Sequence, residues 1–270
     1  MGDPTDDRRP PISGGTRLAA VIGAPVRHSL SPTLLNTAFA EAGLDWHFMA
    51  LEVAEGQAGE ALDAVRALGL VGLSVTMPHK AAVAAAVDHR TDEAEALDAV
   101  NCVVVEEDRL VGHNTDGDGF LDGLRHDAGL DPTGRRTVVL GAGGAARAVV
   151  LALARAGAEI AGLDHDADLL ALARVKAEES SLSIDWVEGD MAEFDLGRRF
   201  AQIYVPYRTF QHLLTPADQI RALHCMADHL VDGGQGSRRG PLGERWIQFE
   251  APAQMLPDRS QGEDHLDDPD

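Results

Sequence analysis

The residues of this sequence that are best suited to chemistry gather at the end of a short apolar run, Leu73–Thr76. This run predicts a β-strand, and Pro78 must end it because proline cannot continue a sheet ladder. Lys80 therefore follows the strand end and points into open space. A lysine ammonium in such a place can donate a hydrogen bond to an oxygen atom, stabilise negative charge that develops there and supply a proton.

Two further polar clusters flank this strand in the sequence. Ser29-Leu30-Ser31 comes before it, and Asn114-Thr115-Asp116 comes after it. A carboxylate beside Lys80 would orient the ammonium, and serine hydroxyls can donate hydrogen bonds to an anionic ligand without adding charge. Simpler roles remain open, because Ser31 could only cap a helix, Asp116 could only cap the next one, and Asn101 could be a turn residue.

A glycine-rich turn in the second half of the sequence predicts a nucleotide site. It runs from Gly141 to Ala146, follows a buried strand and opens a helix, which is the context in which G-x-G-x-x-(G/A) indicates dinucleotide binding. Small residues let the backbone approach a pyrophosphate at the positive end of the helix. Asp164, at the end of the next strand, suits a ribose hydroxyl, whereas Arg147 could support a phosphate or lie in solvent.

The composition restricts the classes of partner. The chain has 270 residues, a formal net charge of −21 and an apolar fraction of 44%. This acidity argues against nucleic acid or an anionic membrane surface as a partner, and no apolar run is long enough to span a bilayer. The two cysteines, Cys102 and Cys225, are far apart and suggest neither a disulfide nor a zinc site. Since no secretion signal is evident, we expect a cytoplasmic protein without a metal.

The order of the predicted elements indicates an α/β protein with two domains. Strands alternate with helices over residues 17–116, which predicts an N-terminal substrate-binding α/β domain. The same alternation over residues 117–234 predicts a Rossmann-like, doubly wound nucleotide-binding domain. We expect residues 1–16 to be a disordered leader and residues 235–270 an irregular acidic tail, in which 245–250 is a candidate strand.

Five motifs together resemble the shikimate dehydrogenase family. They occur in the family's order and spacing over about residues 17–157, and they are Val21–Pro32, Gly72–Lys80, Ala99–Asn101, Gly112–Gly117 and Gly141–Ala146. The resemblance implies an oxidoreductase that interconverts 3-dehydroshikimate and shikimate and uses NADP as its cofactor.

The resemblance also implies roles for individual positions. Lys80 and Asp116 would be the catalytic pair. Residues that would bind the substrate are Ser29 and Ser31 at its carboxylate, Thr76, Asn101 and Asp116 at its ring hydroxyls, and Lys80 itself. Residues that would bind the cofactor are Gly141, Ala142, Gly143, Gly144 and Ala145. Asp92 occupies a position where family members place an acidic residue near the cofactor.

After about residue 158 the sequence departs from this family. Members usually carry an Asn-Arg-Thr/Ser turn after the second strand of the nucleotide domain, and its arginine binds the 2′-phosphate of NADP. This chain has Leu163-Asp164-His165-Asp166 there. Because a carboxylate would repel a 2′-phosphate, NAD becomes a competing cofactor. The family's later Asn-Ala-Thr segment and its glycine-rich C-terminal segment are absent as well.

Residues 150–234 instead resemble a class I S-adenosylmethionine-dependent methyltransferase. In that family Asp164 would be the acid that binds ribose, and the loop with Asp190 would contact adenine. We therefore interpret the chain as a mosaic of the two families. The leading hypothesis is shikimate dehydrogenase activity with NADP or NAD. The alternatives are methyl transfer from S-adenosylmethionine and a binding-only or inactive protein.

Overall fold

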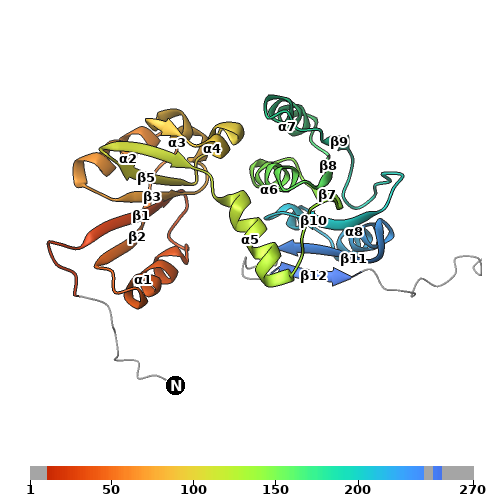
Figure 1. Cartoon of the computed structure of the whole chain (residues 1–270), viewed down its shortest axis with the longest axis horizontal. Helices are drawn as coiled ribbons and strands as arrows, with labels where there is room; N and C mark the ends of the chain where they lie inside the picture. The colour runs from red at the N-terminus through yellow and green to blue at the C-terminus, as the bar shows by residue number, and fades with distance from the viewer. Residues whose placement is uncertain (1–10, 240–245, 251–270) are drawn as a thin grey trace, which may run out of the picture. The chain divides into compact units, whose positions relative to one another are not determined.

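The structure is a computed structural model that describes residues 11–239 and 246–250 and divides into two compact units (Figure 1). The first unit holds the chain up to Asp131 together with Gly143–Arg155 and Leu172–Ser183. The second holds Pro132–Ala142, Ala156–Ala171 and the described residues from Ile184 onward. Among the described residues, no helix has both the length and the apolar character needed to cross a membrane.

The first unit is built on a mixed sheet with the strand order β2-β1-β3-β5-β6-β4. The strands are β1 (Arg17–Gly23), β2 (Trp46–Glu52), β3 (Gly72–Val75), β4 (His89–Arg90), β5 (Cys102–Glu106) and β6 (Arg109–His113). β1 runs parallel to β2 and β3, whereas β5 and β6 form an antiparallel hairpin beside β3. Glu107 and Asp108 form the hairpin turn and both have positive φ angles, which two-residue hairpin turns of this kind require.

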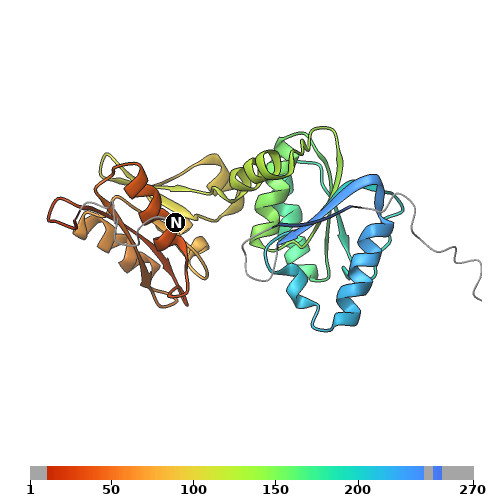
Figure 2. The same ribbon diagram turned by 90° about the horizontal axis from the view of Figure 1, so that it is seen from below.

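Helices cover both faces of this sheet, because successive apolar residues of β1 point to opposite faces (Figure 2). The helices of the unit are α1 (Ser31–Glu41), α2 (Ala58–Leu68), α3 (Lys80–Ala86), α4 (Asp92–Leu97), α5 (Asp116–Ala128) and α6 (Gly144–Arg155). Val21 packs in one cluster with Phe39 of α1. Ile22 packs in another cluster with Leu62 of α2.

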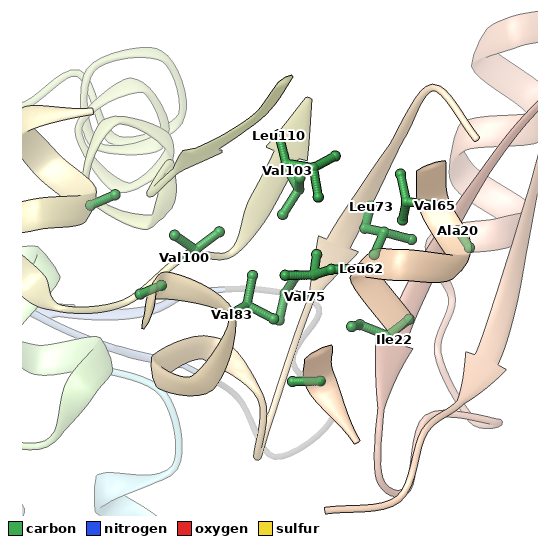
Figure 3. Close-up of a cluster of buried hydrophobic side chains, with 13 residues drawn as sticks. Ala20, Ile22, Leu62, Val65, Leu73, Val75, Val83, Val100, Val103 and Leu110 are labelled. Atoms are coloured by element: carbon green, nitrogen blue, oxygen red, sulfur yellow. The ribbon is translucent and has the colours of Figure 1, made fainter. Parts of the chain in front are cut away.

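The larger core of this unit joins the strands to α2 and α3 (Figure 3). Leu73 and Val75 of β3 lie in this core with Val83 of α3. β3 is therefore anchored by apolar contacts up to its last residue, and the polar residues that follow it start from a rigid support.

This topology brings the predicted site residues of the first unit to one edge of the sheet. β1 and β3 end at this edge and lead into the segments that contain Ser31 and Lys80. β5 is antiparallel to β3 and so begins there, directly after Asn101. β6 ends there, opposite the start of β5 and shortly before Asp116.

The second unit contains a sheet with the strand order β12-β11-β10-β7-β8-β9. Its strands are β7 (Arg136–Leu140), β8 (Glu159–Asp164), β9 (Asp185–Glu188), β10 (Phe200–Val205), β11 (Leu230–Arg239) and β12 (Trp246–Glu250). All neighbours are parallel except β12. The helices of this half of the chain are α7 (Ala167–Glu179), α8 (Pro216–Asp228) and the short 3₁₀ helix η1 (Thr209–His212).

The strand order confirms the predicted doubly wound arrangement. From central β7 the chain passes outward to β8 and β9 and then returns to β10 on the other side of β7. In such sheets ligands bind at the carboxyl ends of the strands where the order reverses. The glycine-rich turn follows β7 and Asp164 ends β8, so both lie at this edge.

The structure corrects the prediction for the end of the chain. Residues 230–239 form a strand that continues through the Gly233-Gly234 pair, whereas we expected the chain to be irregular from residue 235 onward. Gly233 has a φ of 71°, and a Cβ on Gly234 would lie 2.8 Å from the Val231 carbonyl oxygen. The two glycines therefore form an irregularity within β11. Residues 240–245 and 251–270 of the predicted tail lie outside the described residues.

The predicted leader also needs a correction near its end. Residues 1–10 lie outside the described residues, but residues 13–16 form a turn in which the Thr16 N–H donates to the Ser13 carbonyl at 3.2 Å. The Thr16 hydroxyl also donates to the Asp45 carboxylate at 2.8 Å. This contact ties the turn to the residue just before β2.

Candidate functional site

Lys80 and Asp116 form an ion pair at the edge of the first unit's sheet where the predicted site residues gather. Each residue begins a helix: Lys80 begins α3 directly after the Pro78 turn, and Asp116 begins α5. The Lys80 Nζ donates to Asp116 Oδ2 at 2.6 Å. The side chains are 30% and 36% exposed, so the pair is partly shielded from water but still accessible to a ligand.

Asp116 is held by Asn101 as well. The Asn101 Nδ2 donates to Asp116 Oδ1 at 2.7 Å, so each carboxylate oxygen accepts one side-chain hydrogen bond. Asn101 Oδ1 in turn accepts the N–H of Thr115 at 3.0 Å. The Asp116 N–H donates to Asn114 Oδ1 at 3.1 Å, and the buried Asn114 donates to the Ala99 carbonyl at 2.9 Å. This network fixes the carboxylate that binds the ammonium.

Thr76 lies at the same edge, on the segment that leads to Lys80. Its N–H donates to the Ile22 carbonyl at 3.0 Å, which extends the pairing of β1 and β3 by one residue. A Cβ on Gly23 would lie only 2.5 Å from Thr76 Cγ2, so the close approach of the two strand ends requires glycine there. His79 is buried, and its Nε2 donates to the Val53 carbonyl at 2.8 Å, which gives it a structural role.

Ser29 and Ser31 follow β1 at this edge, and the structure corrects the capping role expected for Ser31. Leu30 is the N-cap of α1, and its side chain makes no capping bond. Ser31 is the first helical residue, and its N–H donates to Ser29 Oγ at 3.2 Å. Ser29 therefore binds the helix end, whereas the Ser31 hydroxyl is not used as a cap.

The glycine-rich turn of the second half is bonded to the end of β8. Gly141 has a φ of 123°, which favours glycine, and its N–H donates to the Leu163 carbonyl at 2.6 Å. The Ala142 N–H donates to Asp164 Oδ2 at 2.6 Å, and the Asp166 N–H donates to Asp164 Oδ1 at 3.0 Å. The Asp164 side chain is only 10% exposed, so this carboxylate is a fixed part of the turn.

The geometry of the turn fits a pyrophosphate. A Cβ added to Gly143 or Gly144 would meet no protein atom within 4 Å, so the space beside the turn is open. α6 begins at Gly144, and the first N–H groups of a helix have no partner within the helix. Such groups bind phosphates at helix N-termini. The structure therefore offers donors and room for the linking phosphates of a dinucleotide.

Arg147 and Asp92 were the remaining charged candidates near the cofactor. Arg147 lies on α6 and is half-buried, and its Nε is buried without a hydrogen-bond partner among the described residues. Burial lowers the pKa of Arg147, although the negative charge of Asp98 acts in the opposite direction. Arg147 therefore does not simply lie in solvent. Asp92 is exposed in the first turn of α4, where negative charge suits the helix dipole.

Two residues that position the site had no individual role assigned from the sequence, although Asn114 belonged to the predicted polar cluster Asn114-Thr115-Asp116. Asn114 orients Asp116 through its backbone, and Gly23 allows the close approach of Thr76. A polar residue directly between an apolar strand and a helix start was the available signal for Asn114. Gly23 carried no signal beyond its position in the Val21–Pro32 motif.

Two family descriptions match separate parts of the chain. Residues 21–103 match the shikimate dehydrogenase substrate binding domain. Residues 139–234 match a methyltransferase domain. The second match begins before the predicted limit of residue 150, and it therefore includes the glycine-rich turn.

Curated relatives match more than half of this chain. The shikimate dehydrogenase (NADP(+)) of Geobacter metallireducens is 50% identical over 147 residues, which are 54% of this chain and 51% of the relative. The enzyme of the same name from Methanopyrus kandleri is 40% identical over 194 residues, which are 68% of this chain and 67% of the relative. The chain belongs to the shikimate dehydrogenase family. Its matching part nevertheless spans about half the length of the Geobacter relative.

A solved structure of the shikimate dehydrogenase family agrees with this assignment. The shikimate 5-dehydrogenase from Listeria monocytogenes, in complex with shikimate and NAD, superposes with a TM-score of 0.72 at 31% identity. The match covers 83% of this chain and 78% of that one. This similarity supports the predicted substrate-binding domain and Rossmann-like domain as the architecture of the chain.

Proposed function

We propose that this chain is a shikimate dehydrogenase-like oxidoreductase that interconverts 3-dehydroshikimate and shikimate with a nicotinamide dinucleotide. The observation that carries the proposal is the hydrogen-bonded set of Lys80, Asp116 and Asn101, with contacts of 2.6 and 2.7 Å. A cation held by a fixed carboxylate, beside an amide, is suited to bind and protonate an oxygen atom. Family membership provides the substrate that this set would act on.

In the proposed reaction Lys80 acts on the oxygen that changes between carbonyl and hydroxyl. Its ammonium donates a hydrogen bond to the carbonyl, stabilises the negative charge that develops on this oxygen and transfers a proton to it. In the reverse direction the neutral amine accepts the proton. Asp116 keeps the ammonium oriented, because one carboxylate oxygen binds Lys80 and the other binds Asn101.

The remaining residues of this edge would hold the substrate. We assign the ring hydroxyls to Thr76, Asn101 and Asp116, which lie on three neighbouring strand ends. We assign the substrate carboxylate to Ser29 and Ser31, since hydroxyl donors bind an anion without adding charge. The Ser31 hydroxyl makes no capping bond, which leaves it available for this role.

The cofactor of the proposed reaction is NADP(H) or NAD(H), which supplies or accepts the hydride when bound. The curated relatives are named for NADP(+), and this supports NADP(H). The backbone donors and open space at Gly141–Ala145 fit the linking phosphates that both dinucleotides share. Asp92 would add a carboxylate near the cofactor.

Steady-state oxidation of shikimate tests the reaction. We expect the purified, folded protein to form reduced cofactor from shikimate with NADP⁺ or with NAD⁺. No turnover with either cofactor, in protein with a cooperative melting transition, would reject the proposal.

Chemical labelling tests substrate binding separately. The chain contains only two lysines, Lys80 and Lys176. Lys176 binds Asp98 and Glu179 and is therefore a built-in control. We expect shikimate to slow reductive methylation of Lys80 but not of Lys176, as measured by mass spectrometry. Equal slowing at both lysines, or at neither, would contradict the assignment of Lys80 to the substrate site.

A second candidate function is methyl transfer from S-adenosylmethionine. The match of residues 139–234 to a methyltransferase domain favours it specifically. Asp164 would then bind the ribose, and Asp190 would contact the adenine from the loop after β9. Calorimetry with S-adenosylhomocysteine tests this candidate. Absence of binding heat, together with saturable binding of NADP⁺ or NAD⁺, would reject it.

A further inference from the structure

We infer that the nucleotide site selects an adenosine whose ribose carries a free 2′-hydroxyl, so that NAD(H) binds in preference to NADP(H). The choice of a nicotinamide dinucleotide rests on the proposed function, whereas the preference for a free 2′-hydroxyl rests on the residues at the end of β8. This preference differs from the cofactor in the names of the curated relatives.

The first observation is that Asp164 cannot move away from the site without losing two hydrogen bonds. Its Oδ2 accepts the Ala142 N–H at 2.6 Å, and its Oδ1 accepts the Asp166 N–H at 3.0 Å. These donors come from the turns after two neighbouring strands, β7 and β8. Only 10% of the side chain is exposed, so the carboxylate is largely enclosed by the protein in this position.

The second observation is that Asp164 retains capacity to accept hydrogen bonds. An ionised carboxylate offers about four lone-pair sites, and the two backbone donors occupy two of them. The remaining sites suit the hydroxyl groups of a ribose, which donate. They do not suit a phosphate monoester, which at neutral pH only accepts and carries about −1.5 to −2 charges.

The third observation is the charge of the surrounding turns. Asp164 and Glu188 are register partners at the ends of the parallel strands β8 and β9. Asp166 follows in the same turn as Asp164, and Asp190 follows Glu188 in the next. The sequence has no arginine or lysine from Ala156 to Ala173.

His165 is the basic side chain nearest in sequence to this carboxylate. It is largely exposed, and its Nδ1 lies 3.4 Å from Asp164 Oδ1. A 2′-phosphate at the end of β8 would therefore face the fixed Asp164 carboxylate, and the segment from Ala156 to Ala173 supplies no arginine or lysine to bind it. Like charges within about 4–6 Å at this partly buried edge favour the unphosphorylated ribose by at least about tenfold in affinity.

Calorimetric titration at pH 8 with NAD⁺, NADP⁺ and S-adenosylhomocysteine tests the inference. We expect NAD⁺ to bind at least about tenfold more tightly than NADP⁺. Tighter binding of S-adenosylhomocysteine than of NADP⁺ would also support a site for a free ribose. It would show that the ribose the site recognises belongs to the methyltransferase ligand. Equal or tighter binding of NADP⁺, or binding of none of the three, would overturn the inference.

Two variants and one control show whether Asp164 and its neighbours cause the preference. We expect Asp164→Asn to reduce the ratio of the NADP⁺ and NAD⁺ dissociation constants to about threefold or less. Because this change also weakens a bond to the turn, exposed His165→Arg is the second variant, and it should raise NADP⁺ affinity with little effect on NAD⁺. Glu178→Gln removes the same charge from an exposed position on α7 and should leave the ratio unchanged. An unchanged ratio in both site variants would overturn the assignment.

This inference and the proposed function can fail independently. Failure of shikimate oxidation with both cofactors rejects the dehydrogenase reaction even when NAD⁺ binds more tightly than NADP⁺. If NADP⁺ binds more tightly than NAD⁺ and shikimate oxidation is therefore faster with NADP⁺, the dehydrogenase reaction is supported and the inference is overturned.

Discussion

At the scale of single residues, Asp116 connects the two groups on which the proposed chemistry depends. One of its carboxylate oxygens accepts from Lys80 and the other from Asn101. Asp116 thereby orients the Lys80 ammonium. The other N–H bonds of Lys80 stay available to a substrate oxygen. Loss of Asp116 would therefore affect both neighbours.

Replacement of Lys80 tests this arrangement directly. We expect Lys80→Met to lower kcat for shikimate oxidation by about 10²- to 10⁴-fold, because the proton donor is removed while the apolar stem of the side chain is kept. Steady-state kinetics and the melting temperature should be measured together. The matched control is Lys176→Met, which should lower the melting temperature while kcat is retained. A Lys80→Met protein with normal kcat would contradict the catalytic role.

At the scale of elements, the position of Asp116 depends on how closely α5 approaches α6. Asp116 begins α5, and the next residue is Gly117. A Cβ on Gly117 would lie 3.0 Å from the Ala152 Cβ and 3.1 Å from the Ala148 carbonyl oxygen of α6. The close contact of the two helices thus requires glycine at the residue directly after Asp116.

Two alanine substitutions in the same helix separate packing from helix propensity. We expect Gly117→Ala to destabilise the protein by about 1–3 kcal/mol and to lower kcat, because α5 must shift and carry Asp116 with it. Gly119→Ala places its Cβ in open space and should stabilise the protein by up to about 1 kcal/mol. Urea unfolding and kinetics of both variants provide the comparison. Equal effects of the two substitutions would show that the α5–α6 contact does not position the site.

At the scale of the whole molecule, ionised carboxylates tie distant segments of the first unit together. The hydrogen bond from Lys176 of α7 is the main cause that lowers the pKa of Asp98, and a bond from Arg90 adds to it. The hydrogen bond from the Leu110 N–H is the main cause that lowers the pKa of Asp88, followed by the bond from Arg66. These carboxylates stabilise the fold only while they are ionised.

The pH dependence of stability follows from the sign of these pKa shifts. Asp98 and Asp88 have lower pKa values in the folded state than the value of about 3.9 in the unfolded state. Their contribution is therefore complete above about pH 4 and is lost as the pH falls through the folded pKa values. We expect urea unfolding at a series of pH values between about 2 and 6 to show this loss.

An Asp98→Asn variant isolates one of the two groups. Asp98 has a φ of 46°, a conformation that asparagine also tolerates. We expect the variant to lose about 1 kcal/mol or less at pH 7, since the Asp98 side chain is 55% exposed, and to show a shallower decline below pH 4. Glu178→Gln is the charge-matched control. An acid slope identical to that of the unmodified protein would show that the ion pairs of Asp98 do not stabilise the fold.

Much of the local structure could be predicted because breakers and capping residues mark the ends of the elements. The strand predicted at Leu73–Thr76 agrees with β3 (Gly72–Val75) to within one residue at each end, and the glycine-rich turn follows β7 and opens α6 as predicted. β11 could not be predicted in the same way. A Gly-Gly pair such as Gly233-Gly234 is typical of the end of a strand, but pairing with β10 and β12 keeps this segment within the sheet.

The sequence by itself determined which groups are available and in what order they occur: an ammonium after a proline-terminated strand, serines before a helix, a glycine-rich turn after a buried strand and an acid after the next one. Only the tertiary structure decided that Lys80 and Asp116, 36 residues apart, share a hydrogen bond, and that Asn101 occupies the other carboxylate oxygen. It also decided that Asp164 is immobilised by two turns. The physical reason is that these contacts depend on the order and direction of the strands in the sheet, a non-local property that no short motif contains.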